Sequence, residues 1–555
     1  MTNFFLLSIF LSFFWFIRET KAILFWLYLW QLKEYHIGRF LDHFQTEKGK
    51  RLLFNKLLIL KILTLLIPVI LWRSPLFYGA FSLSLFLIIL YSFESIKGFY
   101  DFSQKKFKKP VFTKKVIFLV FSALVFEIFY LFSLFPRTTF LAFYLLTFDI
   151  LTPAITSGIV LIFQPLTVFL RNQIIKKAKL KRENFRDLLV IGVTGSYGKT
   201  STKEFLATIL SKKFKVLKTK AHQNSEIGIS QCILDDLKPE HEIFVVEMGA
   251  YNRGGIKLLC DIAKPKIGIL TGINEQHLAT FGSQENIIKT KYELIESLPQ
   301  DGLAVFNGSD PYVFSLFQKT KKPKKVYRYR ATADYVEPDI FAKGIIMKKE
   351  KLFFKTVTKD KKAHDFRVNL LGAQHVGNIL AAILVAKVLG MPLEEIAKAC
   401  QKIKAEQGTI QIKKGINGIN ILDSTYSANP DGVLADLDYL KIWRGPAGRP
   451  PASYGVNKKV IVMPCLIELG KATTEIHQKI GEKIGEVCDL CIITTKERFK
   501  EIKEGAINNG MAESNIFYLE NPREIFERIK TFCKEGDIIL LESRVPTQLI
   551  SLLVK

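Results

Sequence analysis

The chain has 555 residues, enough for roughly three or four domains, and carries 48% hydrophobic residues and a formal net charge of +27. This hydrophobic share is high for a soluble enzyme, and the charge admits two kinds of partner, nucleic acid and the anionic surface of a membrane. The seven cysteines are scattered, which excludes the spaced framework of a disulfide-rich secreted protein.

Most of the apolar residues lie in the first third of the chain. Four apolar runs approach or exceed the length needed to cross a hydrocarbon core about 30 Å thick. They are residues 57–72, 75–96, 116–135 and 139–170. A shorter pair, 3–17 and 22–32, is compatible with one tilted span, a signal anchor, or a span followed by an interfacial helix. A cleaved signal peptide is disfavoured, because a basic start and a small-residue cleavage site are missing. We expect a transmembrane helical region at 1–170 with about four to six spans.

The basic residues lie between these runs. Residues 1–186 contain 25 Lys and Arg against 9 Asp and Glu, so +16 of the net charge lies in one third of the chain. By the positive-inside rule we expect an inner-membrane protein whose basic segments, and everything after residue 186, are cytoplasmic. The turns at Arg73 and Arg137 would lie outside. Anionic lipid then accounts for the charge, and we do not expect nucleic acid as a partner.

From residue 187 short apolar runs alternate with helical segments, a pattern typical of an α/β domain with a largely parallel sheet. Buried strands are expected at 188–195, 242–250, 265–273 and 302–308. A helix is expected at 200–213. The Lys-rich residues 321–365 alternate in polarity, which predicts antiparallel strands at one side of this domain. We assign a basic cytoplasmic linker to 171–186 and the domain itself to 187–405.

A second α/β unit, Rossmann-like, is expected at 406–555. A strand followed by a loop is expected at 418–430 and again at 458–470, and further strands at 489–495 and 537–543. Residues 445–455 form a Pro/Gly-rich loop that we expect to be mobile. Cys488 and Cys491 make a C-x-x-C pair, but no second pair or histidine stands at finger spacing, so packing is favoured over a zinc or redox site.

The stretch VTGSYGKTSTKEFL, residues 193–206, puts a glycine-rich turn between a strand and a helix. The usual phosphate loop, G-x-x-x-x-G-K-[ST], would require glycine at Val193, so this is a shortened form. Backbone N–H groups here would wrap a phosphate, with Lys199 on the β- and γ-phosphates and Thr200 as a Mg²⁺ ligand. The alternative is a chance glycine turn before a helix. We expect the nucleotide to contact Thr194, Gly195, Ser196, Tyr197, Gly198, Lys199, Thr200 and Ser201.

Further motifs follow this loop along the chain. They are HQNSEIG (222–228), VVEMGA (245–250), GINEQHLATFGS (272–283), IIKTKYELI (287–295), LLGAQHVGNILAA (370–382), DSTYSANPD (423–431), ELGKATTEIH (468–477) and GDIILLESR (536–544). Over roughly 187–555 this series resembles the Mur ligase family, and within it the branch that adds D-alanyl-D-alanine to a muramoyl tripeptide. The shortened loop T-G-S-x-G-K-T is the family's form. The resemblance implies central and C-terminal α/β ligase domains and an ATP-dependent acid–amino-acid ligase that works through an acyl phosphate.

The resemblance also implies site residues. Glu247 and His277 correspond to the family's Mg²⁺ ligands. Lys291 corresponds to a lysine that is carbamylated in the family, which would make it an oxygen ligand for a second cation. Lys289 is the competing assignment, and an ordinary surface lysine is the alternative. Asn224 corresponds to an asparagine near the γ-phosphate, or is a plain turn residue. The residues expected to take part in catalysis are Lys199, Asn224, His277 and Lys291.

Residues for the other end of the nucleotide follow from the same resemblance. Asn378 matches the last asparagine of the family's G-x-H-N-x-x-N. Asp423, Tyr426 and Asn429 match D-D-x-Y-N-A-N-P, which lies near the ribose and adenine. Helix capping or turn formation is the alternative for the Asp and Asn residues.

The sequence departs from the family pattern at several positions. They are Gln374-His375 in place of His-Asn, Ser424 and Ser427 in place of Asp and Asn, and Leu541-Glu542 in place of Lys-Gly before Ser543-Arg544. The lost lysine lies where the incoming substrate is expected. The family's uridine-nucleotide-binding N-terminal domain has no counterpart here.

These departures leave the substrates open. The acceptor would be the carboxylate of a lipid- or nucleotide-linked cell-wall precursor, and the amine an amino acid or dipeptide. A poly-γ-glutamate-type amide ligase is the alternative within the family. An inactive membrane scaffold and a nucleic-acid-dependent ATPase are the alternatives from other classes. The expected cofactors are ATP and Mg²⁺, and membrane lipids are expected as partners.

Overall fold

The computed structural model describes residues 2–44, 47–70, 76–104, 107–134, 140–221, 223–329, 336–348, 351–404, 410–425, 429–443 and 457–554. The chain forms two compact units, Met1–Asn172 and Gln173–Lys555, which we consider separately. Tyr426, the loop at 445–455 and the turns at Arg73 and Arg137 lie outside the described residues.

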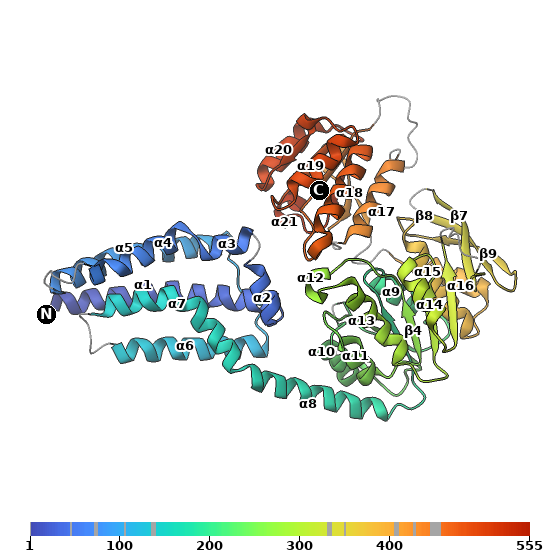
Figure 1. Ribbon diagram of the computed structural model, residues 1–555, viewed down its shortest axis with the longest axis horizontal. Coiled ribbons are helices and arrows are strands. Elements are labelled where there is room, and N and C mark those ends of the chain that lie inside the picture. The colour runs from blue at the N-terminus through green and yellow to red at the C-terminus, as the bar shows by residue number, and fades with distance from the viewer. Residues whose placement is uncertain are drawn as a thin grey trace. The chain divides into compact units, whose positions relative to one another are not determined.

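The first unit is helical (Figure 1). Its helices are α1 (Thr2–Leu32), α2 (Ile37–His43), α3 (Glu47–Leu53), α4 (Lys56–Ile70), α5 (Leu76–Ser103), α6 (Lys114–Leu134) and α7 (Leu141–Ile162). Helix α1 packs against α5, α6 and α7. It is continuous through Arg18, Glu19 and Lys21, so the pair of runs at the N-terminus is one element. The basic segment after residue 170 lies in helix α8 (Gln164–Glu183).

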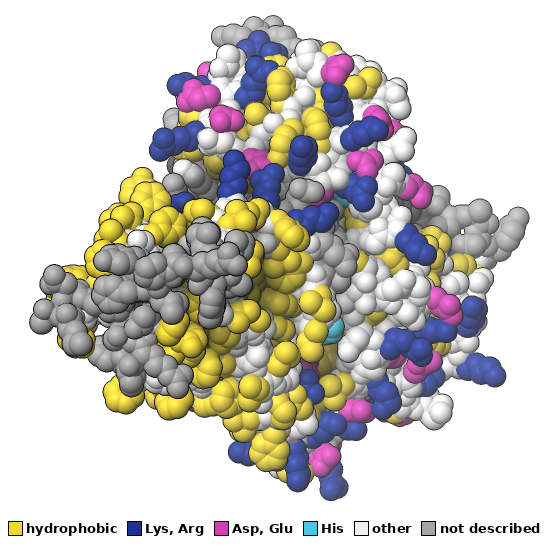
Figure 2. All heavy atoms as spheres, turned by 60° about the vertical axis from the view of Figure 1, so that its left-hand side comes forward, with side chains coloured by type: hydrophobic (Ala, Val, Ile, Leu, Met, Phe, Trp, Pro, Cys, Tyr) yellow, Lys and Arg dark blue, Asp and Glu magenta, His cyan; other side chains and the backbone are white. Residues whose placement is uncertain are grey.

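Three described helices are long and apolar enough to cross a membrane, namely Phe81–Ser103 within α5, then α6 and α7. Helix α4 has only 15 residues. Helix α1 has 31 residues but carries charges at its middle. The described residues therefore support three of the four to six expected spans. Large apolar side chains point outward from α5 and α6, and Figure 2 shows hydrophobic side chains gathered on the surface of this unit.

The second unit begins with a nine-stranded sheet of order β2-β3-β1-β4-β5-β6-β7-β8-β9. The strands are β1 (Leu189–Thr194), β2 (Val216–Lys218), β3 (Ile243–Glu247), β4 (Ile267–Leu270), β5 (Leu303–Asn307), β6 (Lys324–Arg328), β7 (Ile340–Lys348), β8 (Lys351–Thr358) and β9 (Ala363–Val368). Strands β2 to β7 of this order are parallel, and β8 and β9 are antiparallel additions. The predicted α/β class is confirmed. Strand β6 differs from the expected antiparallel group, because it pairs in parallel with β5.

Helices cover both faces of this sheet. They are α9 (Lys199–Leu210), α10 (Glu226–Gln231), α11 (Gly255–Ala263), α12 (Leu278–Phe281), α13 (Gln284–Glu296), α14 (Pro311–Lys319), α15 (His375–Val388) and α16 (Leu393–Cys400). Alternate residues of β1 enter different cores: Ile191 packs with α9 and α15, and Val190 packs with α11 and α13. Because helices cover both faces of the sheet, we expect a ligand to bind at the carboxyl ends of the strands.

A six-stranded sheet of order β10-β11-β15-β12-β13-β14 forms the C-terminal domain. Its strands are β10 (Gln411–Lys414), β11 (Asn420–Ser424), β12 (Lys459–Met463), β13 (Leu490–Ile493), β14 (Ile516–Tyr518) and β15 (Ile538–Glu542). Its helices are α17 (Pro430–Ile442), α18 (Thr473–Val487), α19 (Phe499–Asn508), α20 (Pro522–Phe532) and α21 (Thr547–Leu553). Only β10 is antiparallel to its neighbour, which confirms the Rossmann-like class. Cys488 and Cys491 are buried in the core of this domain.

Candidate active site

The glycine-rich loop joins β1 to α9 in a conformation that needs its glycines. Gly198 has a left-handed φ of 76°, and a Cβ at this position would lie 2.4 Å from Asn378 Oδ1. A Cβ on Gly195 would lie 2.1 Å from Thr271 Oγ1. The loop therefore lies directly against β4's exit and the first turns of α15. The N-terminal N–H groups of α9 follow it, as an anion site requires.

Lys199 folds back over this loop. Its Nζ donates hydrogen bonds to the carbonyl oxygens of Gly195 at 2.7 Å and Ser196 at 2.9 Å. Burial lowers the pKa of Lys199, and the nearby Glu247 carboxylate opposes that shift. A phosphate would offer this ammonium a charged acceptor, which makes a stronger hydrogen bond than a carbonyl.

Glu247, at the end of β3, accepts hydrogen bonds from three polar side chains next to the glycine-rich loop. Its Oε1 accepts from Thr200 Oγ1 at 3.1 Å and from Asn224 Nδ2 at 3.1 Å. Its Oε2 accepts from Lys203 Nζ at 3.2 Å. The structure thus brings together three residues that the sequence singled out. Lys203, fully buried, was missed, although it lies one helical turn after Lys199.

His277 lies just before α12 with a left-handed φ of 66°. Its Nδ1 lies 2.6 Å from Glu468 Oε2, and its ring packs edge-on against Tyr251 with centroids 5.0 Å apart. Burial lowers the pKa of His277, and the hydrogen bond with Glu468 opposes that shift. Because Nδ1 is engaged by a carboxylate, Nε2 is the nitrogen left for a metal.

Glu468 comes from the C-terminal domain, so the contact with His277 crosses between the two ligase domains. Two other side-chain hydrogen bonds also cross here. Asn274 Nδ2 donates to Asp431 Oδ2 at 2.7 Å, and Gln374 Nε2 donates to Asp436 Oδ1 at 3.2 Å. The ELG motif that contains Glu468 does not predict this contact, because the partner His277 is remote in the sequence.

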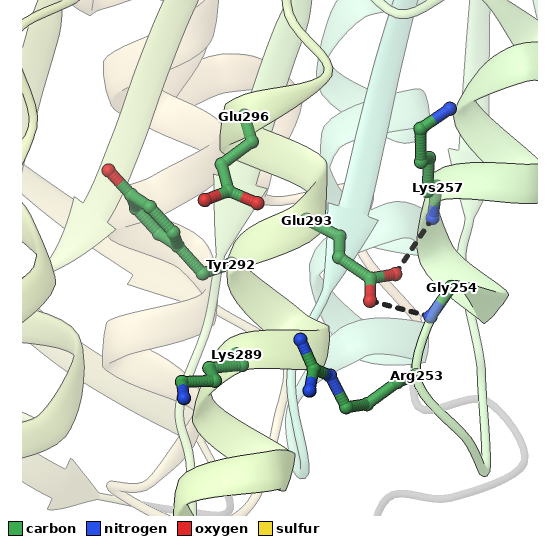
Figure 3. A pocket seen from close by; sticks show the side chains of 7 residues that line it. All are labelled: Arg253, Gly254, Lys257, Lys289, Tyr292, Glu293 and Glu296. Atoms are coloured by element: carbon green, nitrogen blue, oxygen red, sulfur yellow. Dashed lines mark hydrogen bonds between the residues drawn. The ribbon is translucent and has the colours of Figure 1, made fainter.

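Lys289 and Lys291 have opposite environments. The side chain of Lys289 is 53% exposed and pairs with Glu285 Oε1 at 2.6 Å. It lines a surface pocket beside Arg253 (Figure 3). Lys291 is only 3% exposed, and the described residues give it no hydrogen bond or ion pair. Burial, assisted by the charge of Lys199, lowers the pKa of Lys291 to about 7.

The burial of Lys291 has a signal in the sequence. The apolar residues Ile287, Leu294 and Ile295 lie four before and three and four after it, and all are buried on one face of α13. Lys291 lies on that face and Lys289 does not. A lysine whose pKa is near 7 is partly neutral at physiological pH, and carbamylation requires the neutral amine.

The donor set can be tested for a magnesium ion. Among the described residues no three His, Cys, Asp or Glu side chains are grouped to hold a metal. Glu247 and Thr200 supply oxygen atoms to the site. Besides burial, the positive charge of Lys291 is one of the causes that lower the pKa of His277. A carbamate on Lys291 would add the anionic oxygens that Mg²⁺ prefers. The residues therefore fit Mg²⁺ if Lys291 is modified.

The residues expected near the ribose and adenine have mainly local partners. Asp423, at the end of β11, accepts from Lys413 Nζ at 2.5 Å and from Thr425 Oγ1 at 2.8 Å. Asn429 accepts from the Gly432 N–H at 2.9 Å and caps α17, as the capping alternative anticipated. Asn378, by contrast, accepts from Thr202 Oγ1 at 3.3 Å and borders the phosphate loop.

The departure at Gln374 and His375 has a structural explanation. His375 is buried and packs edge-on against Phe205, with centroids 5.9 Å apart. Burial lowers the pKa of His375 to about 4. Gln374 instead supplies the hydrogen bond to the C-terminal domain. His375 is therefore a core residue in this chain, and the amide side chain beside it has the polar contact.

The departures at Ser424 and Glu542 lie side by side near Asp436. These residues are register partners on the neighbouring strands β11 and β15. Ser424 Oγ donates to Asp436 Oδ2. Burial, together with the Asp436 charge, raises the pKa of Glu542 well above its usual value. Asp436 and Glu542 thus form a buried pair of carboxyl groups, and ionisation of one disfavours ionisation of the other.

Comparison with known proteins places this geometry in a family. Residues 193–386 match the family model for the Mur ligase middle domain, and residues 410–544 that for the Mur ligase, glutamate ligase domain. The UDP-N-acetylmuramoyl-tripeptide--D-alanyl-D-alanine ligase of Bacillus subtilis is 29% identical over 355 residues, which cover 64% of this chain and 72% of the relative.

Two solved structures are similar. MurF from Thermotoga maritima in complex with ADP has a TM-score of 0.58 and 26% identity, and the match covers 69% of this chain and 83% of that one. MurF from Acinetobacter baumannii has a TM-score of 0.60 and 24% identity, covering 69% and 80%. The two family matches together span more than half of the chain. The chain therefore belongs to the Mur ligase family, as an enzyme of the ligase class.

Proposed function

We propose that the protein is a membrane-anchored ligase that uses ATP and Mg²⁺ to join a carboxylate of a cell-wall precursor to the amine of an amino acid or dipeptide. The observation that carries this proposal is the convergence of Thr200 and Asn224 on Glu247 at the foot of the phosphate loop. The ADP held by the similar Thermotoga maritima structure supports ATP as the nucleotide.

The chain's own residues suggest how the reaction would proceed. Lys199 and the N–H groups of the loop would bind the β- and γ-phosphates. Thr200, Glu247 and His277, with the Lys291 carbamate, would hold Mg²⁺, which neutralises phosphate charge when bound. The γ-phosphoryl group passes to the carboxylate, giving ADP and an acyl phosphate. The amine then attacks the acyl carbon, and phosphate leaves as the amide forms.

The names of the relatives suggest the substrates. The first candidate pair is a UDP-linked muramoyl tripeptide and D-alanyl-D-alanine, the substrates in the name of the Bacillus subtilis relative. A lipid-linked acceptor is the second candidate, because a helical unit precedes the ligase domains. A poly-γ-glutamate-type reaction remains the alternative. An inactive scaffold is disfavoured, because Lys199, Glu247 and Lys291 are all retained.

Membrane anchoring rests on the first unit. Side chains such as Ile89, Phe93, Phe129 and Phe132 are more than 60% exposed on helices that are long enough to span a bilayer. Exposing so much apolar surface to water would be unfavourable, whereas lipid accommodates it. The basic segments would then face the cytoplasm together with the ligase domains.

The test is phosphate release by the purified full-length protein with ATP, Mg²⁺ and a panel of precursors and amines. We expect release only when both an acceptor and an amine are present. Lys199→Ala should abolish release while the protein stays folded, because a single loop lysine contributes little to stability. Release without an amine, or full activity in Lys199→Ala, would contradict the proposal.

A further inference from the structure

Six ionisable side chains lie in the interior of the helical unit. They are Arg18 and Glu19 of α1, Lys61 of α4, Glu94 of α5, Glu127 of α6 and Asp149 of α7. Burying charged groups inside an apolar helix bundle costs free energy. Such groups are therefore rare, and those that occur often belong to functional sites.

Five of these groups are paired. Arg18 Nη1 lies 2.6 Å from Glu19 Oε2 and also contacts Asp149. Lys61 Nζ lies 2.7 Å from Glu94 Oε2 and 2.8 Å from Asp149 Oδ2. Three carboxylates thus share two cations. The paired group carries one surplus negative charge when all five are ionised.

Glu127 is the sixth group and has no such pairing. It is fully buried on the inward stripe of α6, in line with Leu119, Ala123 and Leu134. Neither of its carboxyl oxygens has a hydrogen-bond partner among the described residues. The charges that act on it are those of Glu19, which repels it, and of Arg18, which is already paired with the three carboxylates of Glu19, Glu94 and Asp149.

Two threonine hydroxyls of α7 are buried in the same bundle. Thr152 Oγ1 lies within hydrogen-bond distance of the Glu19 carboxylate and, at 3.0 Å, of the Phe148 carbonyl. Thr156, one helical turn further along, is also buried, and its Oγ1 has no hydrogen-bond partner among the described residues. Hydroxyl and carboxyl oxygens are the ligands that small monovalent and hard cations accept.

We propose that the helical unit binds a monovalent cation, a proton or Na⁺, at Glu127 and Glu19 with the hydroxyls of Thr152 and Thr156. Without this cation the interior would hold four carboxylates against two cations. An unpaired carboxylate in an apolar interior costs several kcal/mol and is neutralised instead. A purely structural ion-pair cluster that orients the helices would account for the five paired groups but leaves Glu127 unexplained.

The test is chemical labelling of the full-length protein in lipid nanodiscs with dicyclohexylcarbodiimide. This apolar reagent adds to protonated carboxyl groups in apolar surroundings and leaves a stable acylurea, which peptide mass spectrometry locates. In sodium-free buffer we expect labelling of Glu127 at pH 6, whereas Glu94, held by Lys61, stays unlabelled as the matched control. Labelling should fall about tenfold for each pH unit once the proton is lost.

Addition of NaCl distinguishes the two cations. If the site takes Na⁺, NaCl but not choline chloride should suppress labelling of Glu127 at constant pH and ionic strength. If it takes only a proton, the two salts should act alike. Both results support the site. Absence of label on Glu127 at every pH, or equal labelling of Glu94 and Glu127, would overturn it.

A variant adds a second measurement. Glu127→Gln keeps the size and polarity of the side chain but removes the carboxylate that takes up a proton or neutralises Na⁺. Labelling of this peptide should therefore disappear, and any effect of Na⁺ on thermal unfolding should weaken. Labelling requires neither ATP nor turnover. The outcome is therefore independent of the proposed ligase reaction.

Discussion

Two lysines, one in each unit, are almost equally buried but differ in their partners. Lys61 in the helical unit is 2% exposed, and Lys291 in the ligase unit is 3% exposed. Lys61 lies between the carboxylates of Glu94 and Asp149, whereas the described residues give Lys291 no carboxylate partner. Burial alone therefore does not identify a reactive group. A buried lysine without a carboxylate partner, such as Lys291, is the one whose neutral amine becomes accessible, because burial disfavours the charged form.

The largest expected effect is on the paired lysine. Lys61→Met removes one of the two cations that Glu94 and Asp149 share and leaves Arg18 alone to compensate three buried carboxylates. The free energy of unfolding of the helical unit should fall by about 3–5 kcal/mol. Thermal unfolding of the full-length protein in detergent measures this change.

A double variant sharpens the interpretation. Adding Glu94→Gln to Lys61→Met removes one of the stranded charges and should recover part of the lost stability. If Lys61→Met is as stable as the wild type, the ion pairs contribute nothing and the contrast with Lys291 fails.

The unpaired lysine should matter for activity instead. Lys291→Ala should reduce turnover by about 10²–10³-fold, the usual cost of removing one group that stabilises developing charge. Added short carboxylic acids should restore part of the activity by supplying the missing oxygens. Lys289→Ala, the exposed control on the same helix, should change little.

The reverse result would reassign the site. If Lys289→Ala is inactive and Lys291→Ala retains near-normal phosphate release, the competing lysine is the functional one. If neither substitution matters, carbamylation has no role in this chain.

The sequence predicted the elements of the fold better than the contacts between them. Runs such as 188–195 and 302–308 are short, apolar and bounded by polar residues, so β1 and β5 could be placed within two residues. The three-residue strands β2 and β14 were missed because so short a run carries no periodicity. His375 showed a limit of motif matching, since a core residue can occupy a motif position. The nucleotide contact expected of Asn429 stays a prediction, although the residue also caps α17.

Contacts between the two ligase domains could not be predicted from the sequence. Glu468 and His277 belong to different domains, and nothing in the spacing of either motif brings them together. The same holds for Gln374 and Asp436. Such pairs depend on how two sheets face each other, which local patterns do not encode.

Glu468 should have an intermediate effect. Glu468→Ala frees the His277 ring, so the affinity for Mn²⁺, a paramagnetic substitute for Mg²⁺, should fall about 10–100-fold, as is usual when a ligand's supporting carboxylate is lost. Electron paramagnetic resonance of the protein with ADP measures this binding. Glu468→Gln, which keeps an acceptor, should lose less, and Glu475→Ala on the exposed face of α18 should lose nothing. If His277→Ala weakens Mn²⁺ binding but Glu468→Ala does not, Glu468 has no positioning role.

His375 is another buried group without a hydrogen-bond partner in the described part of the chain, and its effect appears only at acid pH. Burial lowers its pKa from 6.5 to about 4, so in that interval the unfolded chain binds a proton that the folded chain does not. Its contribution to stability is therefore complete above pH 6.5 and is lost as the pH falls toward 4. The slope should approach about 1.4 kcal/mol per pH unit.

A matched variant isolates this slope. His375→Met keeps an apolar side chain in the same space and cannot titrate, so the difference in unfolding free energy between wild type and variant should shrink or reverse sign steadily as the pH falls from 6.5 to 4.5. Thermal or denaturant unfolding of both proteins at each pH gives the difference, and all other titrating groups cancel because they are shared. A difference that does not change with pH would mean that His375 accepts its proton while it stays in the core. Burial without a hydrogen-bond partner would then not predict which side chains stay neutral.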